Sequence, residues 1–425
     1  MIRSPASTSL SRQKLAIAMV GLPARGKTYL ARKLSRYLSW IGQRPAVFNV
    51  GHYRRLRFGA GQRSSFFDPA DPAGSAARAQ VAEEALDDAC AWLRGEGTVA
   101  IYDATNTTRE RRATIARRLE GEGHRVVFVE SICHDPAIVE ANVRATKLES
   151  PDYEGVDPDE AVRDFRARLS LYERAYEPID EDALRFIKII DLGRDVVLHR
   201  IEGYLPSRIV YFLLNVHAQP RTIWLTRHGQ SASNLHHRIG GDASLTRLGA
   251  QYAGNLRTFY DEQWRLHGEI AVWTSTLRRT IETARDLPVD AVAWRALDEI
   301  DAGVCDGMTY EEIRVSMASE AEARAKDKFR YRYPRGESYQ DLIERLEPVI
   351  LELERIRTPL LIVSHQAVAR VLYGYLMELA PEASPFHDVP LHTVVELQSQ
   401  PTMTTERRHA LGPRVDLPHK FRASP

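Results

Sequence analysis

Short apolar runs alternate with longer amphipathic stretches through the first half of the chain. Helix-compatible patterns cover stretches such as residues 29–41 and 79–94. Because strands that alternate with helices usually form a parallel sheet covered on both faces, we predict an α/β unit here. The runs typical of buried strands cover residues 15–20, 46–50, 98–102, 126–130 and 186–190.

The same alternation starts again near residue 220. New strand candidates cover residues 222–226, 272–274 and 360–363, and residues 338–357 have a helical pattern. We therefore predict two α/β domains, residues 1–218 and 219–425, as the length of 425 residues also favours. The polar, basic tail after Pro401 is expected to be loose.

Composition and charge exclude several classes of protein. Hydrophobic residues make up 44% of the chain and charged residues 27%, as in ordinary globular proteins. The formal net charge is only +1, which provides no overall field for nucleic acid or an anionic membrane, and no apolar run is long enough to span a bilayer. The three cysteines are widely spaced, which indicates reduced thiols and a cytoplasmic location.

A phosphate-binding loop follows the first predicted strand. Residues 21–28 read GLPARGKT, which fits the GxxxxGKT pattern between a strand and a helix. Glycines let backbone N–H groups surround phosphate oxygens, while Lys27 reaches the outer phosphates and Thr28 can bind Mg²⁺. The loop alone is compatible with a kinase or another NTPase.

Candidate partners of this loop follow further along the chain. Asp103 ends a predicted strand, where a carboxylate could hold the metal, although a strand-end Asp can also simply cap a turn. Lysine is scarce, so Lys147 is a candidate where a compact ammonium is required. Arginines suited to a second phosphate group occur at Arg54, Arg55, Arg109, Arg111 and Arg112.

A second phosphate site is predicted in the second half. Arg227, His228 and Gly229 end a predicted strand, so that the imidazole could act as a nucleophile beside a guanidinium. Asn234, Arg279 and His365, the last also at a strand end, complete a phosphohistidine centre. Glu299 is the candidate general acid, and on spacing alone Asp298 and Asp301 compete with it.

These motifs together resemble the bifunctional 6-phosphofructo-2-kinase/fructose-2,6-bisphosphatase family. The matching stretches include GLPARGKTYL, DATNTTRERR, SRIVYFLLNVHAQPRTIWLTRHG, YRYPRGESYQDLIERLEPVI and SHQAV. The resemblance implies a P-loop NTPase-like, mostly parallel sheet domain followed by a histidine-phosphatase, phosphoglycerate mutase-like α/β domain. It implies synthesis of fructose 2,6-bisphosphate from ATP and fructose 6-phosphate, hydrolysis of its 2-phosphate, ATP and Mg²⁺ as cofactors, and a homodimer.

The resemblance also assigns roles to individual positions. His228 would be the phosphorylated nucleophile, Glu299 the acid and His365 its partner, whereas Lys27, Asp103 and Lys147 would serve the kinase reaction. Nucleotide binding would involve Gly21, Ala24, Arg25, Gly26, Lys27, Thr28, Tyr29 and Asn142, with Thr28 and Asp103 near the metal. Sugar phosphates would be bound in the kinase by Arg54, Arg55, Arg78, Arg111, Arg168 and Tyr172, and in the phosphatase by Arg227, Asn234, Arg279, Tyr310, Arg324, Lys328, Tyr339, Gln366 and Arg370.

Four places depart from the usual family pattern, one of them Asp306-Gly307, which follows EIDAGVC where two acidic residues are typical. Gln230 replaces an acidic residue after RHG, which would remove a charge beside the phosphohistidine, while His52 and His134 replace polar or acidic residues near the kinase motifs. Two alternative hypotheses remain open at this stage. Only one half could be active, or the protein could be a nucleotide or sugar-phosphate sensor without turnover.

Overall fold

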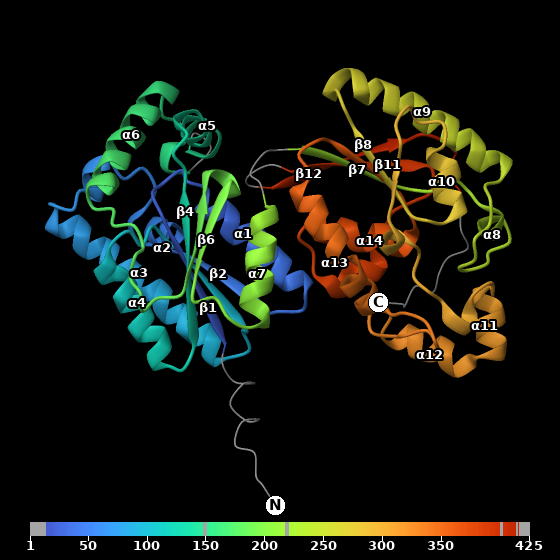
Figure 1. Ribbon diagram of the computed structural model, residues 1–425, viewed down its shortest axis with the longest axis horizontal. Helices are drawn as coiled ribbons and strands as arrows, with labels where there is room; N and C mark the ends of the chain where they lie inside the picture. The colour runs from blue at the N-terminus through green and yellow to red at the C-terminus, as the bar shows by residue number, and fades with distance from the viewer. Residues whose placement is uncertain (1–13, 148–150, 217–220, 400–402, 414, 416–425) are drawn as a thin grey trace, which may run out of the picture. The chain divides into compact units, whose positions relative to one another are not determined.

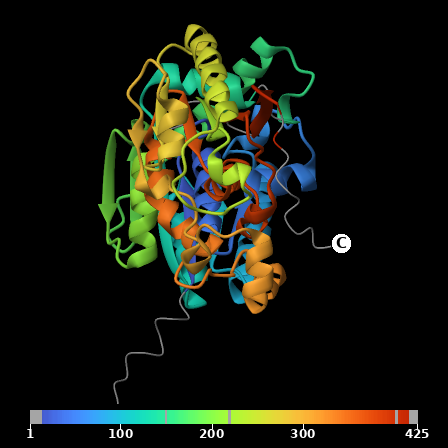
Figure 2. The same ribbon diagram turned by 90° about the vertical axis from the view of Figure 1, so that its right-hand side faces the viewer.

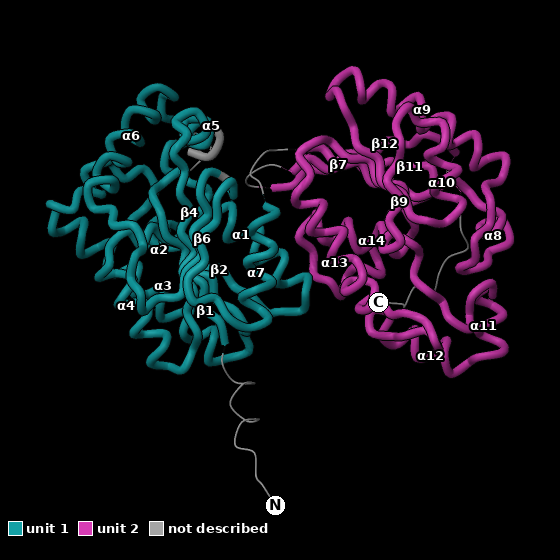
Figure 3. The backbone as a smooth tube through the Cα atoms, in the orientation of Figure 1, with its two compact units in different colours: residues 1–218 teal, residues 219–425 magenta. Residues whose placement is uncertain are grey.

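The chain divides into two units, residues 1–218 and 219–425 (Figure 3). The computed structural model describes residues 14–147, 151–216, 221–399, 403–413 and 415. No helix among these residues is long and apolar enough to cross a membrane. Each unit is an α/β layer structure around its own six-stranded sheet, as the alternating pattern predicted (Figure 1).

The sheet of the first unit has the order β2-β3-β1-β4-β5-β6. Neighbouring strands are parallel, except that β6 runs antiparallel to β5 at the edge (Figure 1; Figure 2 shows the same ribbon turned by 90°). The central strand β1 is buried along its whole length, which explains why its sequence is apolar without alternation. The strands are β1 Leu15–Val20, β2 Pro45–Asn49, β3 Val99–Asp103, β4 Arg125–Ile132, β5 Phe186–Ile190 and β6 Asp195–His199.

Seven α-helices accompany this sheet within the described residues. Several begin at residues with capping side chains: Asn49 accepts from the backbone N–H of His52, and Thr108 accepts from that of Arg111. The helices are α1 Lys27–Trp40, α2 Val50–Phe58, α3 Pro72–Arg94, α4 Arg109–Gly121, α5 Pro136–Lys147, α6 Pro158–Arg174 and α7 Tyr204–Asn215, with 3₁₀ turns η1 Ser64–Phe67, η2 Pro151–Tyr153 and η3 Asp191–Gly193.

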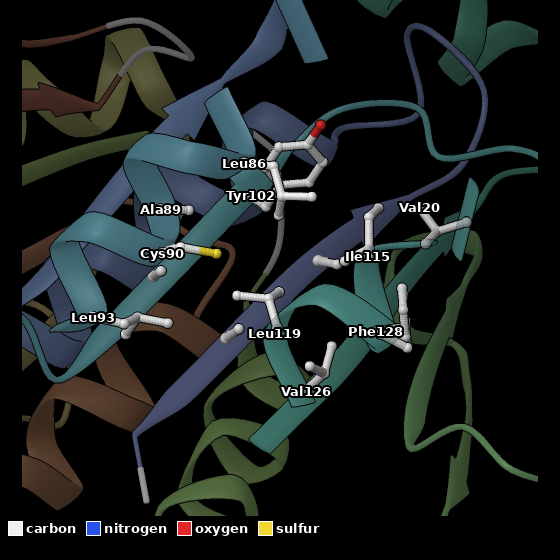
Figure 4. Close-up of a cluster of buried hydrophobic side chains, with 14 of the residues drawn as sticks. Val20, Leu86, Ala89, Cys90, Leu93, Tyr102, Ile115, Leu119, Val126 and Phe128 are labelled. Carbon is white, nitrogen blue, oxygen red and sulfur yellow. The ribbon is translucent and has the colours of Figure 1, made fainter. Parts of the chain in front are cut away.

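A buried cluster fixes α3 and α4 against one face of this sheet (Figure 4). Leu86 and Leu93 of α3 and Leu119 of α4 meet strand residues such as Tyr102 and Phe128, and all five side chains are essentially inaccessible to solvent. Burying side chains of this size stabilises the fold by about 1.5–3 kcal/mol each. The cluster therefore holds the ends of β1, β3 and β4 in place, where the phosphate-binding loop begins.

The sheet of the second unit has the order β12-β11-β7-β10-β8-β9. The strands β7, β10, β8 and β9, which are neighbours in this order, are parallel, whereas β11 runs antiparallel to both of its neighbours. The strands are β7 Arg221–Arg227, β8 Ala271–Thr274, β9 Val292–Ala293, β10 Leu360–Ser364, β11 Thr393–Ser399 and β12 Thr404–Ala410. The helices are α8 Ala232–Leu235, α9 Arg247–His267, α10 Arg278–Ala284, α11 Tyr310–Ser316, α12 Ala318–Lys326, α13 Tyr339–Arg355 and α14 Gln366–Leu376, with 3₁₀ turns η4 Arg295–Leu297, η5 Gly303–Cys305 and η6 Pro381–Phe386.

One expectation about this unit was wrong. The tail after Pro401 is not loose as a whole, because β12 pairs with β11 along seven residues from Thr404 to Ala410. Its sequence, TTERRHA, is polar because it forms the exposed edge of the sheet, and the backbone pairing with β11 holds it in place.

Candidate active sites

The phosphate-binding loop connects β1 to α1 in the first unit. Gly21, Ala24 and Gly26 have positive φ angles of 132°, 58° and 79°, so the loop curls before α1 begins at Lys27. A Cβ atom at Gly21 would lie 2.4 Å from the carbonyl oxygen of Ser131, so only glycine fits there. The backbone thus has the tight turn that a phosphate cradle requires.

Side chains from three other elements surround this loop. Lys27 is buried and donates to the carbonyl oxygen of Leu22 at 2.6 Å, which keeps its ammonium group over the loop. Asn142 of α5 donates to the carbonyl oxygen of Ala24 at 3.1 Å. Thr28 is exposed, Tyr29 lies beneath the ammonium of Lys33, and Arg25 lies 3.9 Å from Glu173.

Asp103 ends β3 and is only 2% exposed. The amide of Asn49, opposite it at the end of β2, donates to its carboxylate. Among the described residues there is no cluster of three or more metal-binding side chains. The third predicted catalytic residue of the kinase, Lys147, ends α5, and its side chain lies outside the described residues.

Three of the predicted sugar-phosphate arginines gather around one carboxylate, Asp152. Arg54 donates to it at 2.7 Å, and Arg55 and Arg168 each lie 3.8 Å away. Burial alone would raise the pKa of Asp152, but the bonds and charges of these arginines outweigh it and hold that pKa below its ordinary value. Arg168 also stacks 3.4 Å from the ring centroid of Phe67. The cluster therefore combines three positive groups with a single buried counter-charge.

The other predicted kinase positions divide into two sets. Tyr172 packs near Phe67, and Arg78 bonds to Ser75 within the same region, where burial lowers its pKa. Arg111, in contrast, donates to the hydroxyl of Tyr102 at 2.5 Å, so its contact is with β3 and not with the Asp152 cluster. The predicted phosphate-site role of Arg109 and Arg112 on α4 is not supported by their contacts, which are structural: Arg112 is fully buried against Glu181, and Arg109 pairs with Asp180.

In the second unit, β7 and β10 bring two histidines together. His228 follows β7 and His365 follows β10, and their ring centroids are 5.2 Å apart. Nδ1 of His228 lies 2.7 Å from the carbonyl oxygen of Gly229, which can only accept, so this nitrogen carries the proton of the neutral ring. The other nitrogen, Nε2, therefore keeps its lone pair for attack on phosphorus.

Two arginines border this pair. Nε of Arg279 lies 3.1 Å from Nε2 of His228 and 3.2 Å from Nδ1 of His365, and Arg227 bonds to the carbonyl oxygen of Val389. Burial lowers the pKa of both histidines well below the ordinary value, and the positive charges of Arg279 and Arg227 lower it further. Burial also lowers the pKa of Arg227 to about 10. The free pocket thus holds neutral imidazoles beside guanidinium groups.

The helix α14 begins directly after His365, and the side chain of Glu299 lies against the amino-terminal end of this helix. The oxygens of Glu299 accept backbone N–H bonds from Gln366 at 3.0 Å and from Ala367 at 3.1 Å. Asp298 is engaged instead with Thr276, and Asp301 with the N–H of Gly303. Of the three carboxylates that competed for the acid role, only Glu299 lines the pocket that contains both arginines and His228.

This pocket extends from His228 toward α11, α12 and α14. Arg324 donates to the hydroxyl of Tyr333 at 3.0 Å, and Lys328 donates to the carbonyl oxygen of Pro385 at 2.8 Å. Burial and the charges of Arg370 and Arg324 lower the pKa of Lys328 to about 7. The predicted residues among those that line the pocket are Arg227, His228, Asn234, Arg279, Glu299, Tyr310, Arg324, Lys328, Tyr339, Gln366 and Arg370.

Some functional neighbours were missed in the sequence. Ser275 contacts His365, Tyr333 contacts Arg324, and His392 accepts the backbone N–H of Gln230. In the first unit, Asp152 was not singled out among the candidate residues. Except for Tyr333 and Arg324, which are nine residues apart, these contacts join segments far apart in the chain, and the local pattern has no signal for them.

Comparison with known proteins agrees with the division of the chain into two units. Residues 3–220 match the family model 6-phosphofructo-2-kinase, and residues 223–410 match the model of the histidine phosphatase superfamily, branch 1. The chain also resembles the crystal structure of the alpha-ribazole phosphatase from Shigella flexneri, with a TM-score of 0.41, 25% identity, and coverage of 46% of this chain and 99% of that one.

Two curated relatives show the extent of the similarity. The 6-phosphofructo-2-kinase/fructose-2,6-bisphosphatase of Gallus gallus is 50% identical over 385 residues, which cover 90% of this chain and 81% of the relative. The protein of the same name from Arabidopsis thaliana is 49% identical over 403 residues, or 93% of this chain, but this chain spans only 54% of that relative. On these matches to both halves, the chain belongs to the 6-phosphofructo-2-kinase/fructose-2,6-bisphosphatase family.

Proposed function

We propose that this chain makes fructose 2,6-bisphosphate from ATP and fructose 6-phosphate in its first unit and hydrolyses the 2-phosphate in its second. The observation that carries the proposal is the pairing of His228 and His365 around Arg279, in the same chain as a phosphate-binding loop. Each unit handles phosphate by different chemistry, so the two activities can oppose each other. In the family, this balance would control glycolysis and gluconeogenesis.

In the kinase reaction, the loop amides and Lys27 would hold the β- and γ-phosphates of ATP. The guanidinium groups around Asp152 would bind the 6-phosphate of the sugar, with Arg78 and Tyr172 beside them. Asp103 would lie near the sugar hydroxyl that receives the phosphoryl group, and Lys147 would stabilise the group in transfer. Arg111 belongs to this proposal only on resemblance, because its hydroxyl partner is Tyr102.

A magnesium ion fits the residues at this site. Mg²⁺ usually binds through one or two protein oxygens together with substrate phosphates. Thr28, exposed at the start of α1, and Asp103, buried at the end of β3, would be those ligands, and the ion would neutralise charge on the phosphates.

The phosphatase reaction would proceed in two steps through His228. In the first, the Nε2 lone pair attacks the 2-phosphate, the bond from phosphorus to the sugar oxygen breaks, and Glu299 gives a proton to that oxygen. In the second, water attacks the phosphohistidine, its proton passes to Glu299, and the bond from phosphorus to nitrogen breaks. Arg227, Arg279 and Asn234 would stabilise the charge on the phosphoryl oxygens.

The remainder of the pocket would bind the sugar and its 6-phosphate. Arg324, Lys328 and Arg370 are the cations of this region, and a phosphate dianion beside Lys328 would favour its charged form. Tyr310, Tyr339 and Gln366 would bind the sugar hydroxyls. We further propose a cytoplasmic homodimer that binds neither nucleic acid nor membranes, in line with the near-neutral charge and the three buried, unpaired cysteines.

The test is a paired assay of the full chain. Wild-type protein is given fructose 6-phosphate with MgATP, and separately fructose 2,6-bisphosphate labelled at the 2-phosphate. Lys27→Ala should abolish only synthesis, and His228→Ala only hydrolysis and the labelled phosphoenzyme. Loss of both activities from one folded variant, or absence of either activity from the wild type, would refute the two-site proposal.

A further inference from the structure

Three polar groups form a chain of contacts behind the phosphatase pocket. The hydroxyl of Thr280 lies 2.8 Å from the carbonyl oxygen of Leu277, the hydroxyl of Ser275 lies 2.8 Å from that of Thr280, and Nε2 of His365 lies 2.7 Å from Ser275. Ser275, Thr280 and His365 are completely buried. Proton positions in such a chain are set by the groups that accept and donate, since no bulk solvent reaches them.

The carbonyl groups at one end determine which atom donates in each hydrogen bond of this series. The hydroxyl of Thr280 lies 2.8 Å from the carbonyl oxygen of Leu277 and 3.2 Å from that of Ser275, and because a carbonyl oxygen only accepts, Thr280 donates its single proton to this pair of acceptors. The hydroxyl of Thr280 must then accept from that of Ser275, so Ser275 has no further hydroxyl proton to donate. The remaining lone pairs of Ser275 accept from the backbone N–H of Leu277 at 3.1 Å and from Nε2 of His365. The neutral His365 ring therefore carries its proton on Nε2.

This leaves Nδ1 of His365 as the nitrogen that faces the reaction. It accepts from Nε of Arg279, the same group that donates to Nε2 of His228. The His365 ring thus donates one N–H bond to Ser275, and the His228 ring donates one to the carbonyl oxygen of Gly229. The other nitrogen of each ring directs its lone pair toward Arg279. Ser275 is not among the residues that line the pocket, so any effect on substrate passes through His365 or the helix α10.

We propose that Ser275, oriented by Thr280, is a positioning residue of the phosphatase: it fixes a proton on Nε2 of His365 and so makes Nδ1 the nitrogen that titrates beside the transferring phosphoryl group. This inference rests on the function proposed above. The groups that lower the pKa of His365 are Arg279 of α10, Arg227 of β7 and Arg345 of α13, together with the His228 ring, and the carboxylate beside it is that of Glu299, which accepts from the backbone of Gln366 and Ala367. The arginines disfavour a proton on Nδ1 until an anionic phosphate enters.

The bond to Ser275 matters most when His365 is positively charged. Hydrogen bonds from a charged donor are roughly twice as strong as neutral ones, so the hydroxyl stabilises the imidazolium more than the neutral ring. Ser275→Ala removes this stabilisation and lowers the pKa of His365 in the substrate complex. The alkaline limb of phosphoenzyme formation should then move to lower pH, with a fall in rate of about tenfold.

The experiment uses the full chain with ¹⁵N-labelled histidine. NMR of the free enzyme reports which nitrogen of His365 carries the proton, and rapid quench with fructose 2,6-bisphosphate gives the single-turnover rate of His228 phosphorylation against pH. Ser275→Ala should show the tenfold loss and the shifted limb at unchanged KM, and Thr280→Val a smaller change in the same direction. Thr222→Val, a buried hydroxyl of β7 outside this chain of contacts, is the matched control, and kinase activity reports folding.

Three results would overturn the inference. A proton on Nδ1 of neutral His365 in the wild type would reverse the direction of the chain. A Ser275→Ala enzyme with an unmoved alkaline limb would remove the positioning role, and one with only a raised KM would indicate a structural effect through α10 and Arg279. If the wild type forms no phosphohistidine, the proposed function fails, while the NMR spectrum still decides where the proton lies.

Discussion

Replacing Arg279 by methionine tests the centre of the phosphatase site most directly. Methionine keeps the unbranched part of the side chain as far as the position of Nε, but removes the guanidinium of a residue that is only 4% exposed and contacts both His228 and His365. Loss of one preorganised donor to a developing oxyanion typically costs about 10²–10³-fold in kcat, or about 2.7–4 kcal/mol. We expect a loss of that size in phosphoenzyme formation from Arg279→Met, with kinase activity unchanged.

The same substitution should change the pH dependence. Burial is the first cause of the low pKa of His228 and the charge of Arg279 is the second, so both imidazole pKa values should rise toward the ordinary value in the variant. Because His228 attacks only when Nε2 is unprotonated, the rate is lost as pH falls through this pKa. The acid limb should therefore move to higher pH in Arg279→Met.

Rapid-quench measurements of His228 labelling between pH 5 and 9 would provide both quantities. Arg285→Met is the matched control, because Arg285 is the exposed arginine that follows α10, with a side chain 68% exposed. Thermal unfolding of each variant separates an unfolded protein from an inactive one. A rate within tenfold of the wild type, or an acid limb that does not move, would show that Arg279 does not act on the two histidines as we describe.

Three further substitutions have defined outcomes. Gly21→Ala should reduce kinase kcat/KM by at least about tenfold and leave the phosphatase intact, because its Cβ would lie 2.4 Å from Ser131; a steady-state assay of both reactions checks this. Lys328→Met should raise the phosphatase KM by about tenfold with little change in kcat, measured with fructose 2,6-bisphosphate, since the variant would lose the charged bond to the 6-phosphate that we propose for Lys328. His124 is buried without a hydrogen-bond partner among the described residues, and burial lowers its pKa, so the unfolded chain binds the extra proton and stability falls as pH drops below about 6.5. Denaturant unfolding of His124→Leu between pH 7 and pH 5 should show a smaller fall than in the wild type.

Much of the fold could be predicted because its strands are buried on both faces. The runs at residues 15–20 and 186–190 coincide with β1 and β5, and the other predicted strands differ from the structure by one or two residues at their ends. The strands that were missed lie at sheet edges or beside them. β6 and β12 are largely exposed, and β12 is mostly polar, so neither has the hydrophobic pattern of a buried strand. What defines them is the pairing of their backbones with a neighbouring strand.

Site residues could be predicted from the sequence where they directly follow a strand. The roles of charged residues were predicted less well where their partners lie in distant parts of the chain. His228 and His365 lie together because β7 and β10 are adjacent parallel strands, whose carboxyl ends meet at one edge of the sheet. The arginine-rich stretch on α4 had the same composition as a phosphate site, yet Arg112 is buried against Glu181. Whether an arginine serves a ligand or a carboxylate depends on a partner 69 residues away, which a local pattern does not contain.

Gln230 shows the same limit at a single position. Its sequence suggested a missing charge beside the phosphohistidine, but its side-chain oxygen accepts from Thr246, the residue that caps α9, at 2.8 Å. Gln230 is not among the residues that line the pocket, while its backbone N–H donates to His392. An acidic side chain in this rotamer would accept the same bond from Thr246 and would lie near the amino-terminal end of α9, where negative charge is favourable. The difference between glutamine and an acid should therefore affect the anchoring of the loop after His228 more than the charge at phosphorus.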